Sequence, residues 1–356
     1  MGNLEWIMPF NPKATFSFNQ TPRDFIVKEE PLYDFSGKGE HLILKVRKKG
    51  LSTWEMINIF SNHLGISKRD IGYAGLKDKN ALTIQHISLP KKFQKEVEAF
   101  SHSNIKILDS TYHDNKIRVG HLKGNHFDIR LKKVLGASKE KIDSTLNWIE
   151  KNGSPNYFGY QRFGVDGTNY LDGKKILDGE LKIRDKKLSK FLISAYQSYL
   201  FNQWLSKRVE LSRLIDEFAE VEVEKIFDLE KGSLEGVKSQ GNFFKILRGD
   251  LLFHYPFGKI FFAEDLESES QRFLKQDISP TGLLAGKKVK LSKDVAFEIE
   301  SRFLTKIDEI GSRRYAWIFP KEIKKSYIPQ KAHYELSFFL PKGSYATVII
   351  DFLKDY

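Results

Sequence analysis

An aspartate between two lysines, Lys77-Asp78-Lys79, is the group in this sequence with the clearest capacity for chemistry. The triplet follows a glycine-containing stretch at residues 72–75. Nearby positive charge favours an ionised carboxylate and predicts a lowered pKa for Asp78. An ionised aspartate near a sugar or a base can act as a nucleophile or as a general base. The same triplet is also typical of a solvated charge cluster in a loop, so both interpretations stay open from these residues alone.

Other kinds of chemistry find less support in the residue types. There are no cysteines, which excludes disulfides, a thiolate nucleophile and iron–sulfur clusters. His63 and His86 bracket the Asp78 loop, and His121 and His126 are five positions apart, but no His-x-x-x-His pair or carboxylate cluster accompanies them. No Walker loop and no G-x-G-x-x-G loop is present. We therefore expect no metal and no cofactor.

The segments that must position Asp78 read as a mixture of strands and helices. Residues 24–29 and 41–47 alternate apolar and polar side chains and predict strands, as does 82–90 after the Asp78 loop. Residues 52–64 begin with a Ser/Thr cap and predict a helix, and 91–101 predict a second one.

Later segments continue this α+β pattern. Residues 104–135 predict a β ribbon that turns at 123–125, and residues 138–151 predict a capped helix. A long, substantially buried helix is predicted to begin near Leu188. At the end of the chain we expect one strand with Tyr334, Leu336 and Phe338 on one face. A second expected strand has Tyr345, Thr347 and Ile349 on one face.

Charge and length suggest two domains and a polyanionic partner. The chain has 356 residues and a net charge of +12, and residues 1–156 hold 25 basic and 17 acidic side chains, a net charge of +8. Such a basic region favours nucleic acid. Because the centre is nearly neutral and rich in helix, we predict an inserted domain at 157–316 within a discontinuous domain formed by 1–156 and 317–356. No signal peptide or membrane span is apparent, so we expect a cytoplasmic protein, and a monomer by default.

The stretch around Asp78 resembles the signature of the TruD family of pseudouridine synthases, Ala-Gly-x-Lys-Asp-basic-x-Ala-x-Thr-x-Gln. Every position of it matches: Ala74, Gly75, Lys77, Asp78, Lys79, Ala81, Thr83 and Gln85. Four further segments are similar to family elements in the same order. These segments are the strand that starts at Asp24-Phe25, the stretch Gly124-Asn125-His126-Phe127, the 155–164 stretch Pro-Asn-Tyr-Phe-Gly-Tyr-Gln-Arg-Phe-Gly and the helix at 195–202. The 340–347 stretch Leu-Pro-Lys-Gly-Ser-Tyr-Ala-Thr is similar to the C-terminal element.

This resemblance implies a pseudouridine-synthase-type α+β fold, with a mixed, largely antiparallel sheet, flanking helices and an inserted α/β domain specific to TruD. It implies an isomerase that converts uridine 13 of tRNA to pseudouridine without a cofactor. Asp78 would be the catalytic carboxylate, acting either at the sugar or as a base at its 2′ carbon. Flipping the nucleotide out costs a few kcal/mol of stacking, which aromatic side chains can offset.

The resemblance also implies contacts to the target nucleotide from Phe25, Asn125 and Tyr345. Phe25 and Tyr345 could stack on uracil, and Asn125 offers a donor and an acceptor. Without the family, the two aromatics would be read as core residues and Asn125 as a turn residue. In the region where the family places a basic partner for the aspartate, this chain has Asn19 and Gln20. Lys77 or Lys79 could take that role, and both lysines are also expected to bind the substrate. Arg162 is expected to contact a phosphate.

Two other functions compete with this one. An RNA-binding protein without activity would share the charge and most of the motifs. A metal-dependent nuclease would use Asp78 with nearby histidines and would be suppressed by a chelator.

Overall fold

The computed structural model describes residues 6–10 and 12–355, which form two compact units. The sheet unit comprises residues 13–143, 320–343 and 354–356. The helix unit comprises 1–12, 144–319 and 344–353. Each unit has its own hydrophobic core.

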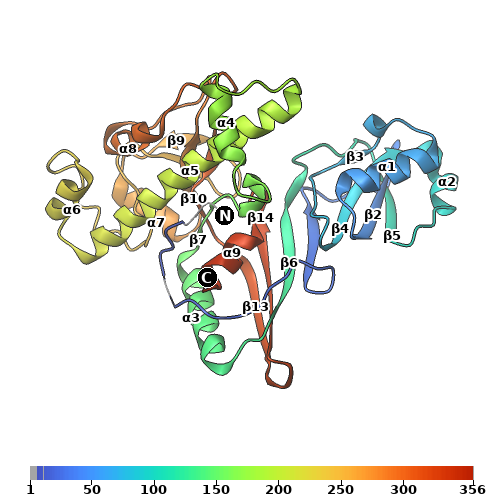
Figure 1. Cartoon of the computed structure of the whole chain (residues 1–356), viewed down its shortest axis with the longest axis horizontal. Helices are drawn as coiled ribbons and strands as arrows, with labels where there is room; N and C mark the ends of the chain where they lie inside the picture. The colour runs from blue at the N-terminus through green and yellow to red at the C-terminus, as the bar shows by residue number, and fades with distance from the viewer. Residues whose placement is uncertain (1–5, 11, 356) are drawn as a thin grey trace. The chain divides into compact units, whose positions relative to one another are not determined.

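An eight-stranded sheet is the framework of the sheet unit (Figure 1). Its strands run in the order β13-β14-β6-β1-β4-β2-β5, and β3 pairs with β4. Only β1 and β4 pair in parallel, so the sheet is mixed and largely antiparallel, as predicted. The strands are β1 (Phe25–Pro31), β2 (His41–Lys49), β3 (Gly72–Tyr73), β4 (Leu82–Pro90), β5 (Ile105–His113), β6 (Leu122–Lys132), β13 (Lys321–Ile328) and β14 (His333–Pro341).

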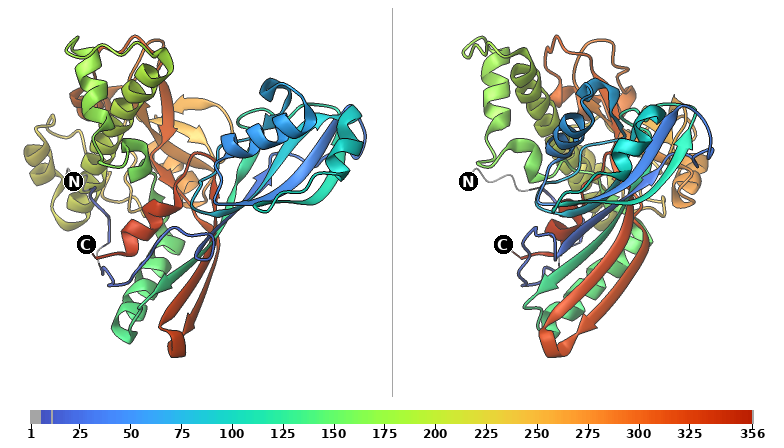
Figure 2. Two further views of the ribbon diagram at one scale, coloured as in Figure 1. Left: turned by 45° about the vertical axis from the view of Figure 1, so that its right-hand side comes forward. Right: turned by 90° about the vertical axis from the view of Figure 1, so that its right-hand side faces the viewer.

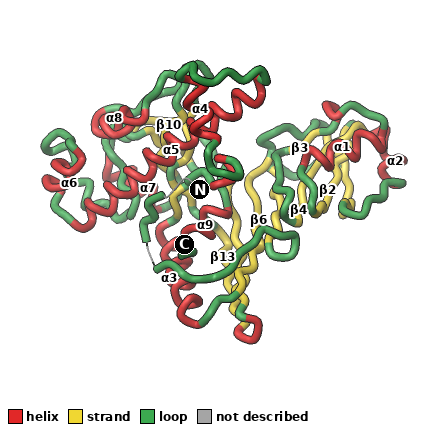
Figure 3. Tube along the Cα trace, in the orientation of Figure 1, coloured by secondary structure: helices red, strands yellow, loops and turns green. Residues whose placement is uncertain are grey.

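Two helices cover part of this sheet, and both were expected from the sequence (Figure 3). Helix α1 (Thr53–Leu64) starts at a capping box in which Ser52 and Glu55 satisfy each other's backbone groups, and it ends at Gly65 in the left-handed conformation. Its buried face, with Met56, Ile57 and Phe60, packs against apolar residues of β2 and β4. Helix α2 (Gln94–Glu98) is shorter than predicted. Single turns η1 (Lys68–Asp70), η2 (Lys91–Phe93) and η5 (Pro329–Lys331) complete the unit.

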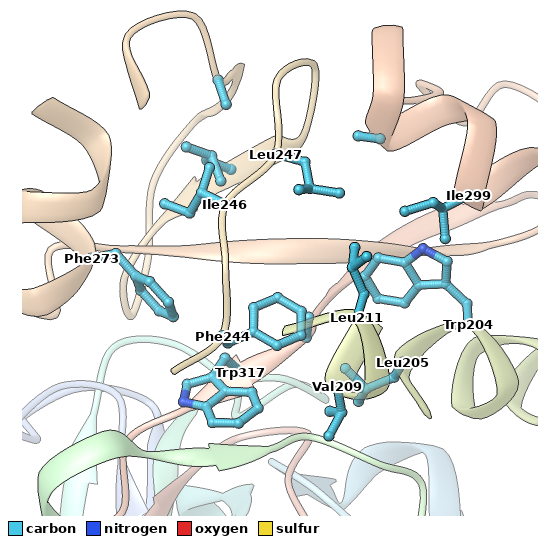
Figure 4. Packing of buried hydrophobic residues seen from close by; sticks show 14 of the residues in the cluster. Trp204, Leu205, Val209, Leu211, Phe244, Ile246, Leu247, Phe273, Ile299 and Trp317 are labelled. Carbon is cyan, nitrogen blue, oxygen red and sulfur yellow. The ribbon is translucent and has the colours of Figure 1, made fainter. Parts of the chain in front are cut away.

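The helix unit is built around one long helix, α5 (Lys186–Glu217), which confirms the helix predicted from Leu188. A small antiparallel sheet of order β11-β10-β8-β9 contacts it, and β7 pairs with β12. Figure 4 shows part of the core, where the rings of Phe244 and Trp317 stack at 5.0 Å. The strands of the helix unit are β7 (Ser154–Pro155), β8 (Leu251–His254), β9 (Ile260–Phe262), β10 (Ile278–Leu284), β11 (Ser312–Tyr315) and β12 (Trp317–Ile318). Its helices are α4 (Asn169–Leu177), α5, α6 (Glu220–Phe227), α7 (Leu266–Leu274), α8 (Asp294–Glu300) and α9 (Ala346–Leu353), with turns η3 (Tyr160–Phe163) and η4 (Ser301–Phe303).

Two predictions about local structure were wrong. The predicted ribbon at 104–135 does not exist as a pair, because β5 pairs with β2 whereas β6 lies between β1 and β14 (Figure 2). Residues 123–125 therefore lie inside β6 and form no turn. The predicted strand around Tyr345 is helix α9, whose residues Val348 and Phe352 are buried. Alternation cannot distinguish a short apolar strand from a buried helix, and burial on several sides favours the helix here.

The predicted insertion at 157–316 lies wholly within the helix unit, which also contains β7, β12 and α9. Helix α3 (Gly136–Asn152), predicted at 138–151, begins among residues of the sheet unit and ends among residues of the helix unit. No helix in the described part of the chain is long and apolar enough to cross a membrane.

Candidate active site

Asp78 lies on the loop between β3 and β4, next to the middle of the eight-stranded sheet. The loop begins at the buried Ala74, whose carbonyl oxygen accepts a hydrogen bond from the Gly120 amide at 2.8 Å. Asp78 itself is exposed. The loop is therefore attached to the protein at its start and presents the aspartate at its surface.

A fully buried lysine, Lys48 on β2, holds the backbone of the Asp78 loop from within. Its Nζ donates to the carbonyl oxygens of Asp78 at 3.2 Å, Lys77 at 3.5 Å and Leu51 at 2.6 Å. Burial lowers the pKa of Lys48 to about 8, with Asp78 opposing the shift and Lys77 adding to it. Lys48 therefore fixes the carbonyl of Asp78, and its positive charge also acts on the Asp78 carboxyl.

Lys77 forms a buried ion pair with Glu29 of β1, the two side chains being 4% and 1% exposed. Lys77 Nζ lies 2.6 Å from Glu29 Oε2, and Glu29 Oε1 accepts the His86 amide at 3.0 Å. Although burial raises the pKa of Glu29, the hydrogen bonds of His86 and the charge of Lys77 bring that pKa below its usual value. The predicted substrate-binding residue Lys77 is thus already paired inside the protein.

The loop is also attached to helix α1 by two polar contacts. The Lys77 amide donates to Thr53 Oγ1 at 2.9 Å, and Thr53 in turn donates to Gln85 at 3.1 Å. Lys79 Nζ lies 2.7 Å from Glu55 Oε1, while the other oxygen of Glu55 accepts the Ser52 amide. Unlike the Lys77 pair, the Lys79 pair is exposed, so Lys79 remains at the surface beside Asp78.

The pKa of Asp78 is raised, contrary to the lowered pKa predicted from its lysine neighbours. Asp78 is exposed as a residue, and yet the surrounding protein removes enough water from its carboxyl group to favour the neutral form. The positive charges of Lys48 and Lys77 oppose this desolvation without outweighing it. Such a balance, in which burial and charge act in opposite directions on one carboxyl, is typical of functional acids and bases.

Asn125 and Phe25 lie on the sheet face that carries Glu29. In the ladder between β1 and β6, Asn125 stands opposite Glu29, and Phe25 stands opposite Ile129. Within the described chain, the side-chain oxygen of Asn125 is buried and has no hydrogen-bond partner. Phe25 is 1% exposed and packs against Phe18 and Phe127.

Gly124, which precedes Asn125, is required by close packing between strands. A side chain at this position would bring its Cβ to 2.1 Å from the Leu340 carbonyl oxygen and 2.5 Å from the Phe339 ring. These distances are far too short for any other residue. The Gly124-Asn125 pair therefore lets β14 approach β6 closely beside Asn125.

Tyr345 and Arg162 belong to the helix unit and lie close to each other there. The Tyr345 ring is half-buried and lies 6.0 Å from the Phe158 ring. The Arg162 guanidinium, 5.9 Å from that same ring, donates to the hydroxyls of Ser194 and Ser198 on α5. Burial lowers the pKa of Arg162, and Tyr345 opposes this shift.

A second arginine of the helix unit, Arg314, joins this cluster. Its guanidinium lies 4.0 Å from the Phe158 ring and 5.8 Å from the Tyr345 ring. It also donates to the carbonyl oxygen of Asn156 at 2.9 Å. Burial lowers its pKa to about 10. The guanidinium groups of Arg162 and Arg314 and the rings of Phe158 and Tyr345 therefore form one cluster.

Sequence reasoning gave no role to Lys48, Glu29 or Arg314. A signal for Lys48 was present, because the alternation that buries Leu42, Leu44 and Val46 in β2 also directs residue 48 inward. A lysine on a buried face is seldom there without a partner. Glu29 lies at the end of the strand predicted at 24–29, but only the fold shows that it meets Lys77. Among residues 6–10 and 12–355, no group of three or more potential ligands could hold a metal ion.

The mixed, largely antiparallel eight-stranded sheet with its helices is a fold of the pseudouridine-synthase class. Comparisons with known proteins agree. The family model for tRNA pseudouridine synthase D (TruD) matches residues 10–184 and 181–351. The crystal structure of a Methanosarcina mazei protein assigned as TruD superposes with a TM-score of 0.71, at 20% identity, over 98% of this chain and 95% of that one.

Curated relatives are more similar in sequence. The tRNA pseudouridine synthase D of Wolinella succinogenes is 54% identical over 338 residues, which cover 94% of each chain. Those of a Nitratiruptor species and of Helicobacter acinonychis are 54% and 48% identical, over 94% and 95% of this chain and 94% and 93% of theirs. This chain belongs to the TruD family of tRNA pseudouridine synthases, which are isomerases.

Proposed function

We propose that this protein converts uridine 13 of tRNA to pseudouridine, with Asp78 as the catalytic carboxylate. The observation that carries the proposal is the exposed Asp78 on a loop whose backbone is held by the buried Lys48 and Lys77. Catalysis requires a carboxylate kept in one position, and a clamped loop supplies this without covering the group.

The reaction rearranges atoms that the uridine already contains. The bond between N1 and the C1′ carbon of the ribose breaks, the base turns over, and a bond forms between C5 and C1′. The proton on C5 leaves and N1 gains a proton, so the reaction needs no oxidant or reductant. Asp78 assists either by attacking the sugar or by removing a proton at the 2′ carbon.

We also propose which side chains recognise the target nucleotide. The unpaired oxygen of Asn125 supports a hydrogen bond to the uracil edge. We assign Tyr345 to stacking and Arg162 to a phosphate contact, since both are half-buried beside a second guanidinium. Lys79, at the surface, is assigned a phosphate contact. Lys77 and Phe25, which are buried, are also proposed as substrate-binding residues.

The test is formation of pseudouridine in unmodified tRNA by the purified protein, with the modified position mapped. D78N is expected to lower turnover by at least about 10²–10⁴-fold, the contribution typical of an acid–base or nucleophilic group. Its tRNA affinity should stay within a few fold. N80A, which changes an exposed neighbour on the same loop, serves as the control and should retain activity. Turnover by D78N within a few fold of the wild type would refute the assignment of Asp78, and modification elsewhere would refute position 13.

The same assay separates the competing functions. An RNA-binding protein without activity would bind tRNA but leave uridine unchanged in a single-turnover reaction. A metal-dependent nuclease would cleave the RNA and would stop in chelator, whereas we expect pseudouridine formation to continue there. We further propose that the protein acts as a cytoplasmic monomer, with 1–156 and 317–356 as the catalytic domain and 157–316 as the insert.

A further inference from the structure

Strand β2 carries a row of exposed basic residues. Lys45, Arg47 and Lys49 are exposed and alternate with the buried Val46 and Lys48. Because side chains alternate across a strand, the three exposed ones share a face, about 6.6–6.8 Å apart along it. The row lies on the sheet face opposite Lys48.

The neighbouring strand β5 adds to this charge where opposite charge would be expected. Arg47 is paired in register with Lys106, so two like charges stand directly opposite each other (Figure 1 labels both strands). Like charges in this position destabilise a sheet. No side-chain hydrogen bond or ion pair of Arg47, Lys49 or Lys106 is found in the described residues. Only Lys45 faces a carboxylate across the strands, that of Asp109.

A cavity of about 560 Å³ lies beside these residues. Arg47, Lys49 and Lys106 contribute to its lining, and Glu98 is the single carboxylate among the residues that line it. The remaining polar groups are hydroxyl, amide and imidazole groups, from Ser101, His102, Ser103, Asn104 and Ser110. Basic groups combined with neutral donors are suited to phosphate oxygens.

We propose that Arg47, Lys49 and Lys106, here called the β2–β5 basic face, bind the phosphate backbone of the RNA substrate. The proposal rests on the proposed function for the identity of the RNA. A phosphate between Arg47 and Lys106 would turn a repulsive pair into two attractive interactions. The face would thus hold the body of the tRNA in a way that does not depend on base sequence.

Protection of a sheet edge is the alternative explanation for lysines on β5, which is an edge strand. It accounts for Lys106 but not for Arg47 and Lys49, because β2 lies inside the sheet between β4 and β5. Edge protection also needs no cavity lined by polar donors. The two explanations differ in what happens when the repulsion is removed.

The test measures stability and tRNA affinity of R47E together. Because the substitution places opposite charges across from each other, the melting temperature should stay the same or rise. The dissociation constant for tRNA should rise several-fold near 0.1 M salt. The slope of log affinity against log salt should become shallower by about one for each phosphate that the variant no longer neutralises. R47Q and K106Q should show smaller decreases in affinity of the same kind.

K331E, which changes an exposed lysine on turn η5 of the same unit, is the matched control and should leave tRNA affinity nearly unchanged. Equal affinities of R47E and K331E would overturn the proposal, whether both match the wild type or both are weaker, because net charge alone would then explain any decrease. Absence of pseudouridine formation by the wild type would refute the proposed function. It would leave the difference in binding between R47E and K331E intact.

Discussion

At the scale of single residues, Lys48 decides how Asp78 is held. Its ammonium donates to backbone carbonyls, including that of Asp78, and its charge also favours the ionised Asp78 carboxylate. The sequence places no basic residue at 19 and 20, where the family resemblance led us to expect a partner for the aspartate. Lys48 supplies a positive charge next to Asp78 from a different strand.

Removing that charge should change how activity depends on pH. In the proposed role Asp78 acts as an ionised carboxylate, so we expect activity to fall as pH drops through its raised pKa. In K48M the pKa of Asp78 should rise further, because one of two opposing charges is gone, and the acid limb of kcat/KM should move to higher pH. K48R keeps the charge and should leave the limb near its wild-type position. A K48M profile that only decreases uniformly in height would contradict this role and indicate loss of loop structure alone.

At the scale of elements, the ion pair between Glu29 and Lys77 ties β1 to the Asp78 loop. Both side chains are nearly inaccessible to solvent. Glu55 makes a second tie, because one carboxylate both caps α1 and pairs with Lys79. Because the first pair is buried, losing one of its partners leaves an uncompensated charge inside the protein, whereas the exposed Lys79 pair contributes little.

E29Q should therefore be costly. It leaves the Lys77 ammonium buried without a counter-charge, and the free energy of unfolding should fall by about 3–5 kcal/mol. Adding K77M removes the uncompensated charge, so the double variant should recover part of the loss. Urea denaturation of the two single variants and the double variant measures the coupling. Additive losses in the double variant would show that the pair does not act as a unit.

At the scale of the whole molecule, two separate cores stabilise two compact units. The core of the helix unit includes Phe244, which is 1% exposed and stacks on Trp317. The core beneath α1 in the sheet unit is a separate cluster with different residues, among them Met56 and Phe60. Cores that share no residue can lose stability independently.

F244A should destabilise the helix unit by about 3–5 kcal/mol through the cavity that it leaves. Hydrogen exchange is expected to accelerate in α5 and β10. Amides of β2 and β4, in the other unit, should keep their protection. F60A provides the reciprocal case in the sheet unit. Equal acceleration in both units with either variant would show that the chain unfolds as one cooperative body.

The elements next to Asp78, and the family, could be predicted from the amino-acid sequence. Strands β1, β2 and β4, helix α1 with its cap, and the long α5 follow from side-chain periodicity and capping, which are local properties. The stretch from Ala74 to Gln85, which resembles the family signature, identified Asp78 as the candidate aspartate. Local pattern failed at β6 and α9, where partners distant in sequence decide between turn and strand or between strand and helix.

Which charges act together could be seen only once the chain was folded. Glu29 and Lys77 are 48 positions apart, and Lys48 and Asp78 are 30 apart, so no local pattern could pair them. The direction of the Asp78 pKa shift also required the fold. Lysine neighbours in the sequence predict a lowered pKa, whereas desolvation depends on how the whole protein surrounds the carboxyl. Electrostatic interactions in proteins depend on burial and on the distance between charges, and both are set by the fold and not by the order of residues.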